Sequence, residues 1–149
     1  MKTNGINHLL FSVSELERSI AFYQEVFGAN LLAKGRTTAY FELNGLWLAL
    51  NEEANIPRNE IHASYTHIAF SIKEEDLVAF EDKLRELNVN LLQGRDRERR
   101  DKTSIYFTDP DGHKFECHTG TLQDRLDYYK DEKKLYVFLL KKLRPLLSP

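Results

Sequence analysis

The chain contains the same pattern twice. Residues 6–13 read Ile-Asn-His-Leu-Leu-Phe-Ser-Val and residues 65–72 read Tyr-Thr-His-Ile-Ala-Phe-Ser-Ile, so His8 and His67 occupy matching places. Each segment alternates like a strand and is followed by a helix-like run and then by an apolar hairpin. A single unit of this kind buries only one of its faces. We therefore expect the two copies to pair around a shared cavity, with equivalent histidines inside it.

In the first copy, one face of the predicted helix carries apolar residues at helical spacing: Leu16, Ile20, Tyr23 and Phe27. Ser14 and Glu17 have the spacing of a capping box, and Gly28 is expected to end the helix. Asn44 and Gly45 lie between two apolar runs, which predicts a two-residue hairpin of type I′.

The second copy repeats this order, with a helix face that consists of Leu77, Phe80, Leu84 and Leu87. Asn88 is expected to end that helix, and the turn at residues 109–112 joins two strands. Each copy therefore reads βαβββ, which predicts an α+β fold. We expect one domain over residues 1–130, made of repeat one at about 4–51, repeat two at about 65–120 and a closing helix at about 121–130, followed by a C-terminal tail over 131–149.

Composition narrows the function classes. Among the 149 residues, 42% are hydrophobic and 30% charged, as in an ordinary globular chain, and the net charge of −2 gives no general attraction for nucleic acid. The longest apolar run near the C-terminus is far shorter than the roughly 20 residues of a membrane span. The single cysteine, Cys117, permits no internal disulfide and fits a cytoplasmic protein.

The repeat itself predicts a metal site. Glu116 follows the turn glycine Gly112 at the same distance at which Ala49 follows Gly45. The equivalent set is then His8, His67, Glu116 and Ala49, in which three positions can bind a metal and the fourth cannot. Two histidines and one carboxylate with an open position are typical of a catalytic metal centre. The residue types alone permit Mg²⁺, Mn²⁺, Zn²⁺ or Fe²⁺.

Other residues of the expected cavity indicate a small anionic ligand. Arg95 lies in an arginine-rich loop and Arg125 follows the last strand, and guanidinium groups suit phosphate-like oxygens. Strand and hairpin positions add further polar and aromatic side chains: Tyr40, Trp47, Asn51, Tyr65 and Tyr106. Cys117 is not expected to be a nucleophile, because strand alternation points it away from the cavity.

Several longer segments carry a family resemblance. They include Gly-Ile-Asn-His-Leu at 5–9, Trp-Leu-Ala-Leu-Asn at 47–51, Asp-Pro-Asp-Gly-His-Lys-Phe-Glu at 109–116 and Gly-Thr-Leu-Gln-Asp-Arg-Leu-Asp-Tyr-Tyr at 120–129. With the paired βαβββ units, these segments resemble the vicinal oxygen chelate superfamily. Within it they resemble most closely the FosB-type metallothiol transferases of fosfomycin resistance, over about residues 4–132.

This resemblance implies an enzyme that adds bacillithiol or L-cysteine to the epoxide of fosfomycin, with Mg²⁺ or Mn²⁺ bound by His8, His67 and Glu116. It also implies a domain-swapped homodimer, in which His8 of one chain joins His67 and Glu116 of the other. Glu116 and Tyr106 would be the catalytic residues. The substrate-contact positions of the family fall on Tyr40, Trp47, Asn51, Tyr65, Arg95, Ser104 and Arg125.

Two alternatives use the same architecture. An Fe(II) extradiol-type dioxygenase has the same ligand types but is generally about twice as long, and a drug-sequestering protein lacks the metal triad. A glyoxalase would usually have a fourth ligand where this chain has Ala49. Leu10 replaces the small or polar residue common in relatives, on the face that carries His8.

Overall fold

The computed structural model describes residues 5–94 and 102–132. Arg95, the rest of its arginine-rich loop and most of the C-terminal tail lie outside these ranges. The first half contains β1 (His8–Val13), α1 (Leu16–Phe27), β2 (Asn30–Lys34), β3 (Thr38–Leu43) and β4 (Leu46–Glu52). The second half contains α2 (Asn59–Ala63), β5 (His67–Ser71), η1 (Glu74–Asp76), α3 (Leu77–Glu86), β6 (Leu91–Leu92), β7 (Ser104–Thr108), β8 (Lys114–His118) and α4 (Leu122–Glu132).

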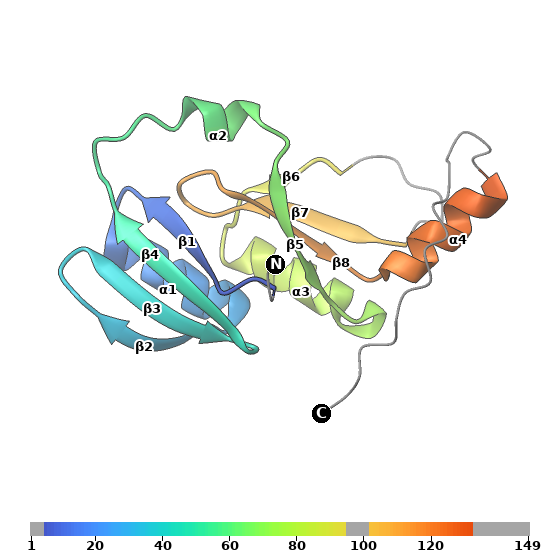
Figure 1. Cartoon of the computed structure of the whole chain (residues 1–149), viewed down its shortest axis with the longest axis horizontal. Helices are drawn as coiled ribbons and strands as arrows, with labels where there is room; N and C mark the ends of the chain where they lie inside the picture. The colour runs from blue at the N-terminus through green and yellow to red at the C-terminus, as the bar shows by residue number, and fades with distance from the viewer. Residues whose placement is uncertain (1–4, 95–101, 133–149) are drawn as a thin grey trace, which may run out of the picture.

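The strands form two four-stranded sheets of identical topology, in the orders β1-β4-β3-β2 and β5-β8-β7-β6. In each sheet the first strand runs parallel to the last strand of its unit, and the remaining pairs are antiparallel. We call β1–β4 with α1 module one, and β5–β8 with α3 module two. The two modules lie side by side, with α2 in the connection between them (Figure 1). The predicted α+β fold of two βαβββ units is confirmed.

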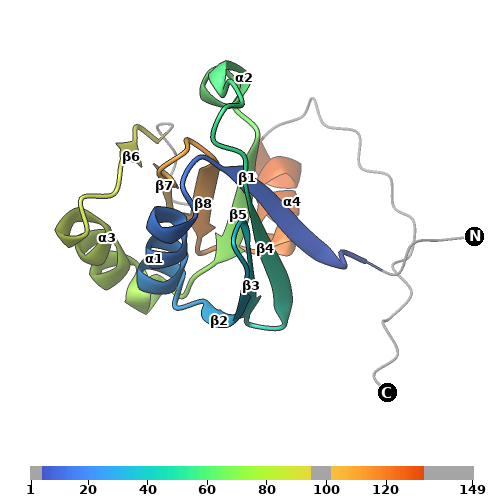
Figure 2. The same ribbon diagram turned by 90° about the vertical axis from the view of Figure 1, so that its left-hand side faces the viewer.

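The helices α1 and α3 cover the same side of the paired sheets (Figures 1 and 2). One hydrophobic core joins the modules, since its fully buried side chains come from both: Val13, Leu16, Tyr23, Phe41, Leu48, Leu50, Leu84, Phe107 and Phe115. Phe27 of α1 packs against three aromatic rings of module two. Its ring centroid lies 5.1 Å from that of Phe70, 5.7 Å from Phe107 and 5.2 Å from Phe115, all in module two. Neither module therefore has a complete core alone.

The local turn predictions are confirmed, but the helix cap is not where the sequence predicted it. Gly28 adopts the left-handed conformation that ends α1, at φ 67°. Asn44 and Gly45 both have positive φ, at 50° and 84°, as a type I′ turn requires. The N-cap of α1 is Glu15, whose carboxylate accepts hydrogen bonds from the backbone of the first turn. The capping box predicted at Ser14 and Glu17 does not form, because a carboxylate of module two accepts from the Ser14 backbone N–H in place of Glu17, and Glu15 accepts from the Glu17 backbone N–H in place of Ser14.

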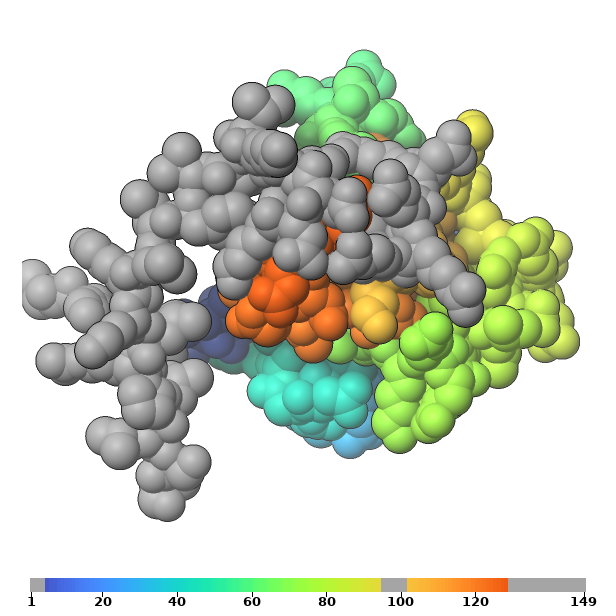
Figure 3. Space-filling view, turned by 90° about the vertical axis from the view of Figure 1, so that its right-hand side faces the viewer, coloured from blue at the N-terminus to red at the C-terminus, as the bar shows by residue number. Residues whose placement is uncertain are grey.

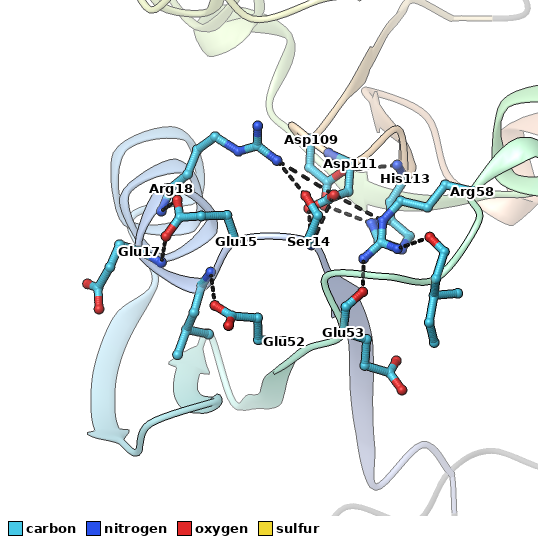
Figure 4. Close-up of polar contacts among 12 residues, drawn as sticks. Ser14, Glu15, Glu17, Arg18, Glu52, Glu53, Arg58, Asp109, Asp111 and His113 are labelled. Atoms are coloured by element: carbon cyan, nitrogen blue, oxygen red, sulfur yellow. Dashed lines mark hydrogen bonds and ion pairs between the residues drawn. The ribbon is translucent and has the colours of Figure 1, made fainter.

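That carboxylate belongs to Asp111, at the tip of the turn that joins β7 and β8 (Figure 4). Asp111 is almost completely buried and accepts hydrogen bonds from Ser14 N at 3.0 Å and from Arg58 Nε at 3.0 Å. Its neighbour Asp109 accepts from the Tyr23 hydroxyl at 3.0 Å, across the same boundary. The turn of module two thus closes over the start and the middle of α1.

Replacing Asp111 with Asn is expected to lower the free energy of unfolding at pH 7 by about 2–3 kcal/mol, because the charged hydrogen bonds from Ser14 and Arg58 are lost. Burial raises the pKa of Asp111, but the hydrogen bonds from Ser14 and Arg58 outweigh it and hold the pKa below its ordinary value. The stabilisation is therefore complete above the unfolded pKa of about 3.9 and is lost as pH falls through the lower folded pKa.

Urea denaturation at pH 7 and at several values below 4 measures this effect. The gap between wild type and Asp111→Asn should narrow as the solution becomes more acid. The matched control is Asp82→Asn on the exposed side of α3, which should unfold like wild type at every pH. A gap that stays constant down to pH 2 would contradict the assignment.

The strand residues that alternate away from the helices form an open face on each module. On module one this face carries large exposed side chains, among them Leu10 at 57% and Trp47 at 44%. On module two Tyr65 is 51% exposed beside strands β5, β7 and β8. The helix α4 lies at the surface of the module two end of the molecule (Figure 3). Exposed apolar surface such as that around Leu10 and Trp47 is typical of a face that another chain covers.

Candidate metal centre

The sheet registers confirm the internal equivalence on which the metal prediction rests. In both sheets the first strand begins with the histidine, which pairs with Trp47 of β4 in module one and with Lys114 of β8 in module two. As a result, Ala49 of β4 and Glu116 of β8 occupy equivalent sites, each two residues beyond the register partner of the histidine. His8 and His67 are likewise equivalent. Module one therefore contributes one possible ligand, and module two contributes two.

His67 and Glu116 lie together on the open face of module two. The distance from His67 Nε2 to Glu116 Oε2 is 3.0 Å. The other ring nitrogen, Nδ1, lies 2.9 Å from the backbone oxygen of Tyr65, so it must carry a proton and donate it. Nε2 then points at the Glu116 carboxylate, and a proton on Nε2 or a divalent metal between the two atoms satisfies this contact. This arrangement of donors suits a divalent metal.

The second oxygen of Glu116 is held by two hydroxyl groups. Oε1 accepts hydrogen bonds from Ser104 Oγ at 2.5 Å and from Tyr106 Oη at 2.7 Å. Both donors come from β7, the neighbouring strand, whose side chains alternate in step with those of β8. These contacts turn Oε1 towards β7 and leave Oε2 beside His67, so a single oxygen of Glu116 is presented to a metal.

Within one chain, His8 does not join His67 and Glu116 in space. It is exposed on module one, where its ring packs on Trp47 at 4.5 Å between centroids, and its Nδ1 lies 2.8 Å from Asn7 Oδ1. Within residues 5–94 and 102–132, no three His, Cys, Asp or Glu side chains are grouped so that they could hold a metal ion. The structure thus brings together two of the three predicted ligands.

The predicted substrate contacts divide between the modules in the same way. Tyr40 and Trp47 meet at 5.9 Å on module one, and Asn51 follows on the same strand as Trp47. On module two, the Tyr65 ring lies 5.1 Å from His67 and 6.4 Å from Tyr106. Ser104 and Arg125 also belong to this half, with Arg125 in the first turn of α4. Arg95 lies outside the described residues.

Cys117 points into the core, as strand alternation predicted, and is 4% exposed. Burial, with a smaller contribution from the charge of Glu116, raises the pKa of this thiol to about 12. A thiol with such a pKa is protonated at neutral pH and unreactive.

Two features near the site were not assigned from the sequence. Lys114 Nζ donates to the backbone oxygens of Ile61 and His62 at 2.6 and 3.1 Å, which ties β8 to α2. His118 approaches the hydroxyl of Ser104 at 2.8 Å. Strand alternation predicts that both share the open face with Glu116, but it assigns them no role. None of the described helices is long and apolar enough to span a membrane.

Comparison with known proteins identifies the family. A model of the glyoxalase/bleomycin resistance protein/dioxygenase superfamily matches residues 5–117. Metallothiol transferase FosB of Lysinibacillus sphaericus is 69% identical over 133 residues, which cover 89% of this chain and 94% of the relative. Metallothiol transferase FosB of Bacillus licheniformis is 64% identical over 132 residues, which cover 89% and 86%.

Among solved structures, the chain is similar to a variant of the fosfomycin resistance protein FosX of Listeria monocytogenes, complexed with Mn(II) and 1S,2S-dihydroxypropylphosphonic acid. The TM-score is 0.76 and the identity 30%, over 85% of this chain and 99% of the other. With two modules of this topology and a histidine–carboxylate pair that suits a metal, the chain belongs to the FosB metallothiol transferases of the glyoxalase/bleomycin resistance superfamily and is a transferase.

Proposed function

We propose that this protein is a metal-dependent thiol transferase that opens the epoxide of fosfomycin with bacillithiol or L-cysteine, and so gives resistance to the antibiotic. The observation that carries the proposal is the His67–Glu116 pair, in which a ring nitrogen and a carboxylate oxygen, both common metal ligands, lie 3.0 Å apart. Such a pair fits a cation, and the similarity to FosB metallothiol transferases supplies the reaction class.

The proposed cation is Mg²⁺ or Mn²⁺, held by His67 Nε2, Glu116 Oε2 and a second histidine. Mn(II) in the similar FosX protein supports this choice. A divalent cation bound there would supply Lewis-acid polarisation of the epoxide oxygen. The three protein ligands leave positions for oxygens of the substrate, because the site equivalent to Glu116 in module one is Ala49.

The second histidine would be His8 of a partner chain, in a homodimer whose open faces cover each other. Three observations support this arrangement: His8 is exposed, the apolar face around it lacks a cover within the described chain, and the substrate residues divide between the modules. A dimer with exchanged modules would bring three residues of one chain next to the module two residues His67 and Glu116 of the other: Tyr40, Trp47 and Asn51.

The phosphonate group of fosfomycin would be bound by Arg125 and by Arg95. A planar guanidinium can bind two phosphonate oxygens at once, which fixes the substrate and offsets its charge. The bound dihydroxypropylphosphonic acid of the FosX complex supports a phosphonate ligand in this fold. Tyr65 and Ser104 line the same half-site, next to His67 and Glu116.

Ring opening requires one proton transfer. The thiol loses a proton when its sulfur attacks an epoxide carbon, and the oxygen released from that carbon gains one. We assign the catalytic role to Tyr106 and Glu116, which lie 2.7 Å apart: the Tyr106 hydroxyl would stabilise the negative charge on the released oxygen, and the Glu116 carboxylate would hold that hydroxyl in place. Cys117 takes no part, because it is buried and protonated.

Thiol-adduct formation measured by mass spectrometry tests the proposal. The protein is incubated with fosfomycin and Mn²⁺ or Mg²⁺, with bacillithiol, L-cysteine or glutathione in parallel, and with a chelator as control. The expected product is a metal-dependent adduct of bacillithiol or L-cysteine. An adduct with glutathione alone would overturn the choice of thiol, and binding of fosfomycin in chelator without any adduct would indicate a sequestering protein.

A further inference from the structure

His118, the last residue of β8, is the feature nearest the site to which no role is yet assigned. Register pairs it with Ser104 on β7. Its Nδ1 lies 2.8 Å from Ser104 Oγ, and the same oxygen lies 2.5 Å from Glu116 Oε1. Ser104 therefore stands between His118 and Glu116 in a continuous chain of hydrogen bonds.

Counting protons shows which atom donates and which accepts in each of these hydrogen bonds. A carboxylate that binds a metal is ionised and can only accept hydrogen bonds. The one proton of the Ser104 hydroxyl must then point at Glu116 Oε1. Ser104 Oγ can only accept from the other side, so His118 Nδ1 must carry the hydrogen. The same direction holds for the neutral and the charged ring.

We propose that His118 is a positioning residue for the metal ligand Glu116. Its Nδ1–H holds the Ser104 hydroxyl so that the serine proton binds Oε1, and Oε2 is left facing His67 and the metal. This inference rests on the metal site proposed above. It differs from a role in catalysis, since His118 Nδ1 lies 3.8 Å from Glu116 Oε1, beyond hydrogen-bond distance, and binds Ser104 instead.

Two observations indicate that the ring is held for this purpose. A side chain at Gly120 would place its Cβ 2.7 Å from His118 Nε2 and 2.9 Å from Lys102 Cγ, so the glycine leaves the space that the ring occupies. In module one the equivalent pair is Thr38 and Asn51, beside Ala49 in place of a carboxylate. The chain thus places the histidine on the module that has a carboxylate to orient.

The test is the affinity of the whole protein for Mn²⁺, measured from the electron paramagnetic resonance signal of free Mn²⁺, with turnover as a second readout. Loss of a group that orients a metal ligand weakens metal binding by about 10-fold or more. We expect this weakening for His118→Ala and for Ser104→Ala. In the double variant we expect the loss of Ser104→Ala alone, because His118 acts only through Ser104.

Matched variants separate the hydrogen bond from the shape of the ring. His118→Asn places an N–H donor where Nδ1 is and should bind Mn²⁺ within about 3-fold of wild type, whereas His118→Gln, with its donor farther out, should resemble His118→Ala. Gly120→Ala should displace the ring and weaken Mn²⁺ binding without touching His118. The backbone at Gly120 is not left-handed, so alanine is compatible with it.

Additive losses in the double variant would overturn the proposal. So would equal losses for His118→Asn and His118→Ala, or a lower melting temperature with unchanged Mn²⁺ affinity, which would indicate a purely structural residue. Absence of Mn²⁺ binding by the wild-type protein has a separate meaning, because it would overturn the metal site itself.

Discussion

Replacing His67 with Ala is expected to reduce thiol transfer to fosfomycin at least about 1000-fold, because it removes a metal ligand whose Lewis-acid contribution amounts to several kcal/mol. His67 is the ligand with the most closely defined geometry, since Tyr65 O fixes one ring nitrogen and Glu116 faces the other. Turnover is measured at saturating Mn²⁺ by the mass of the thiol adduct.

His62→Ala is the matched control, because His62 is exposed on α2 and binds Lys114 through its backbone oxygen, which alanine retains. Its turnover should equal that of wild type. Circular dichroism of both variants checks that they are folded. Near-normal turnover in a folded His67→Ala protein would rule out the proposed metal centre.

Mixing two inactive variants is expected to restore activity, if the site is shared between chains. In a dimer of His8→Ala with His67→Ala, one site takes both of its substituted residues and the other takes neither. Random pairing at a 1:1 ratio makes half of the dimers mixed, so about a quarter of wild-type turnover should return. The chains are unfolded together and refolded before the assay.

The control mixture pairs His67→Ala with Glu116→Ala. Both substitutions fall in module two, so every site in every dimer lacks one ligand and the mixture should stay inactive. Recovery in this control, or none in the first mixture, would show that the ligands are not exchanged as proposed. Recovery in the control would mean that the His67 and Glu116 of one site come from different chains.

The sequence predicts the elements of the fold well, because their signals are local. The glycine after α1 and the Asn44-Gly45 pair have backbone requirements that few other residues satisfy. The helix cap was predicted wrongly at Ser14 because its backbone N–H is bound by Asp111, which is 97 residues away. Nothing in a turn with the sequence Asp-Pro-Asp-Gly indicates that both of its carboxylates are buried, since such turns are ordinarily exposed.

The candidate site was predictable to the extent that strand alternation and the repeat determine it. His67 and Glu116 share a face in the structure, as the repeat implied, and Cys117 points the other way. The contacts of Glu116 with Ser104 and Tyr106 depend on the register of β7 against β8. That register follows from the length of the turn and from packing, which a single sequence does not specify.

The closure of the Asp111 turn over α1 also has a consequence for the order in which the chain can fold during synthesis. Ser14, just before α1, can donate its hydrogen bond to Asp111 only after residue 111 has left the ribosome. Until then the helix and its sheet have an incomplete core, because Phe27 still lacks its aromatic neighbours. Contacts between such distant residues slow folding. The first half of the protein therefore remains exposed to aggregation and proteolysis from the time that β4 is made until the turn between β7 and β8 has emerged.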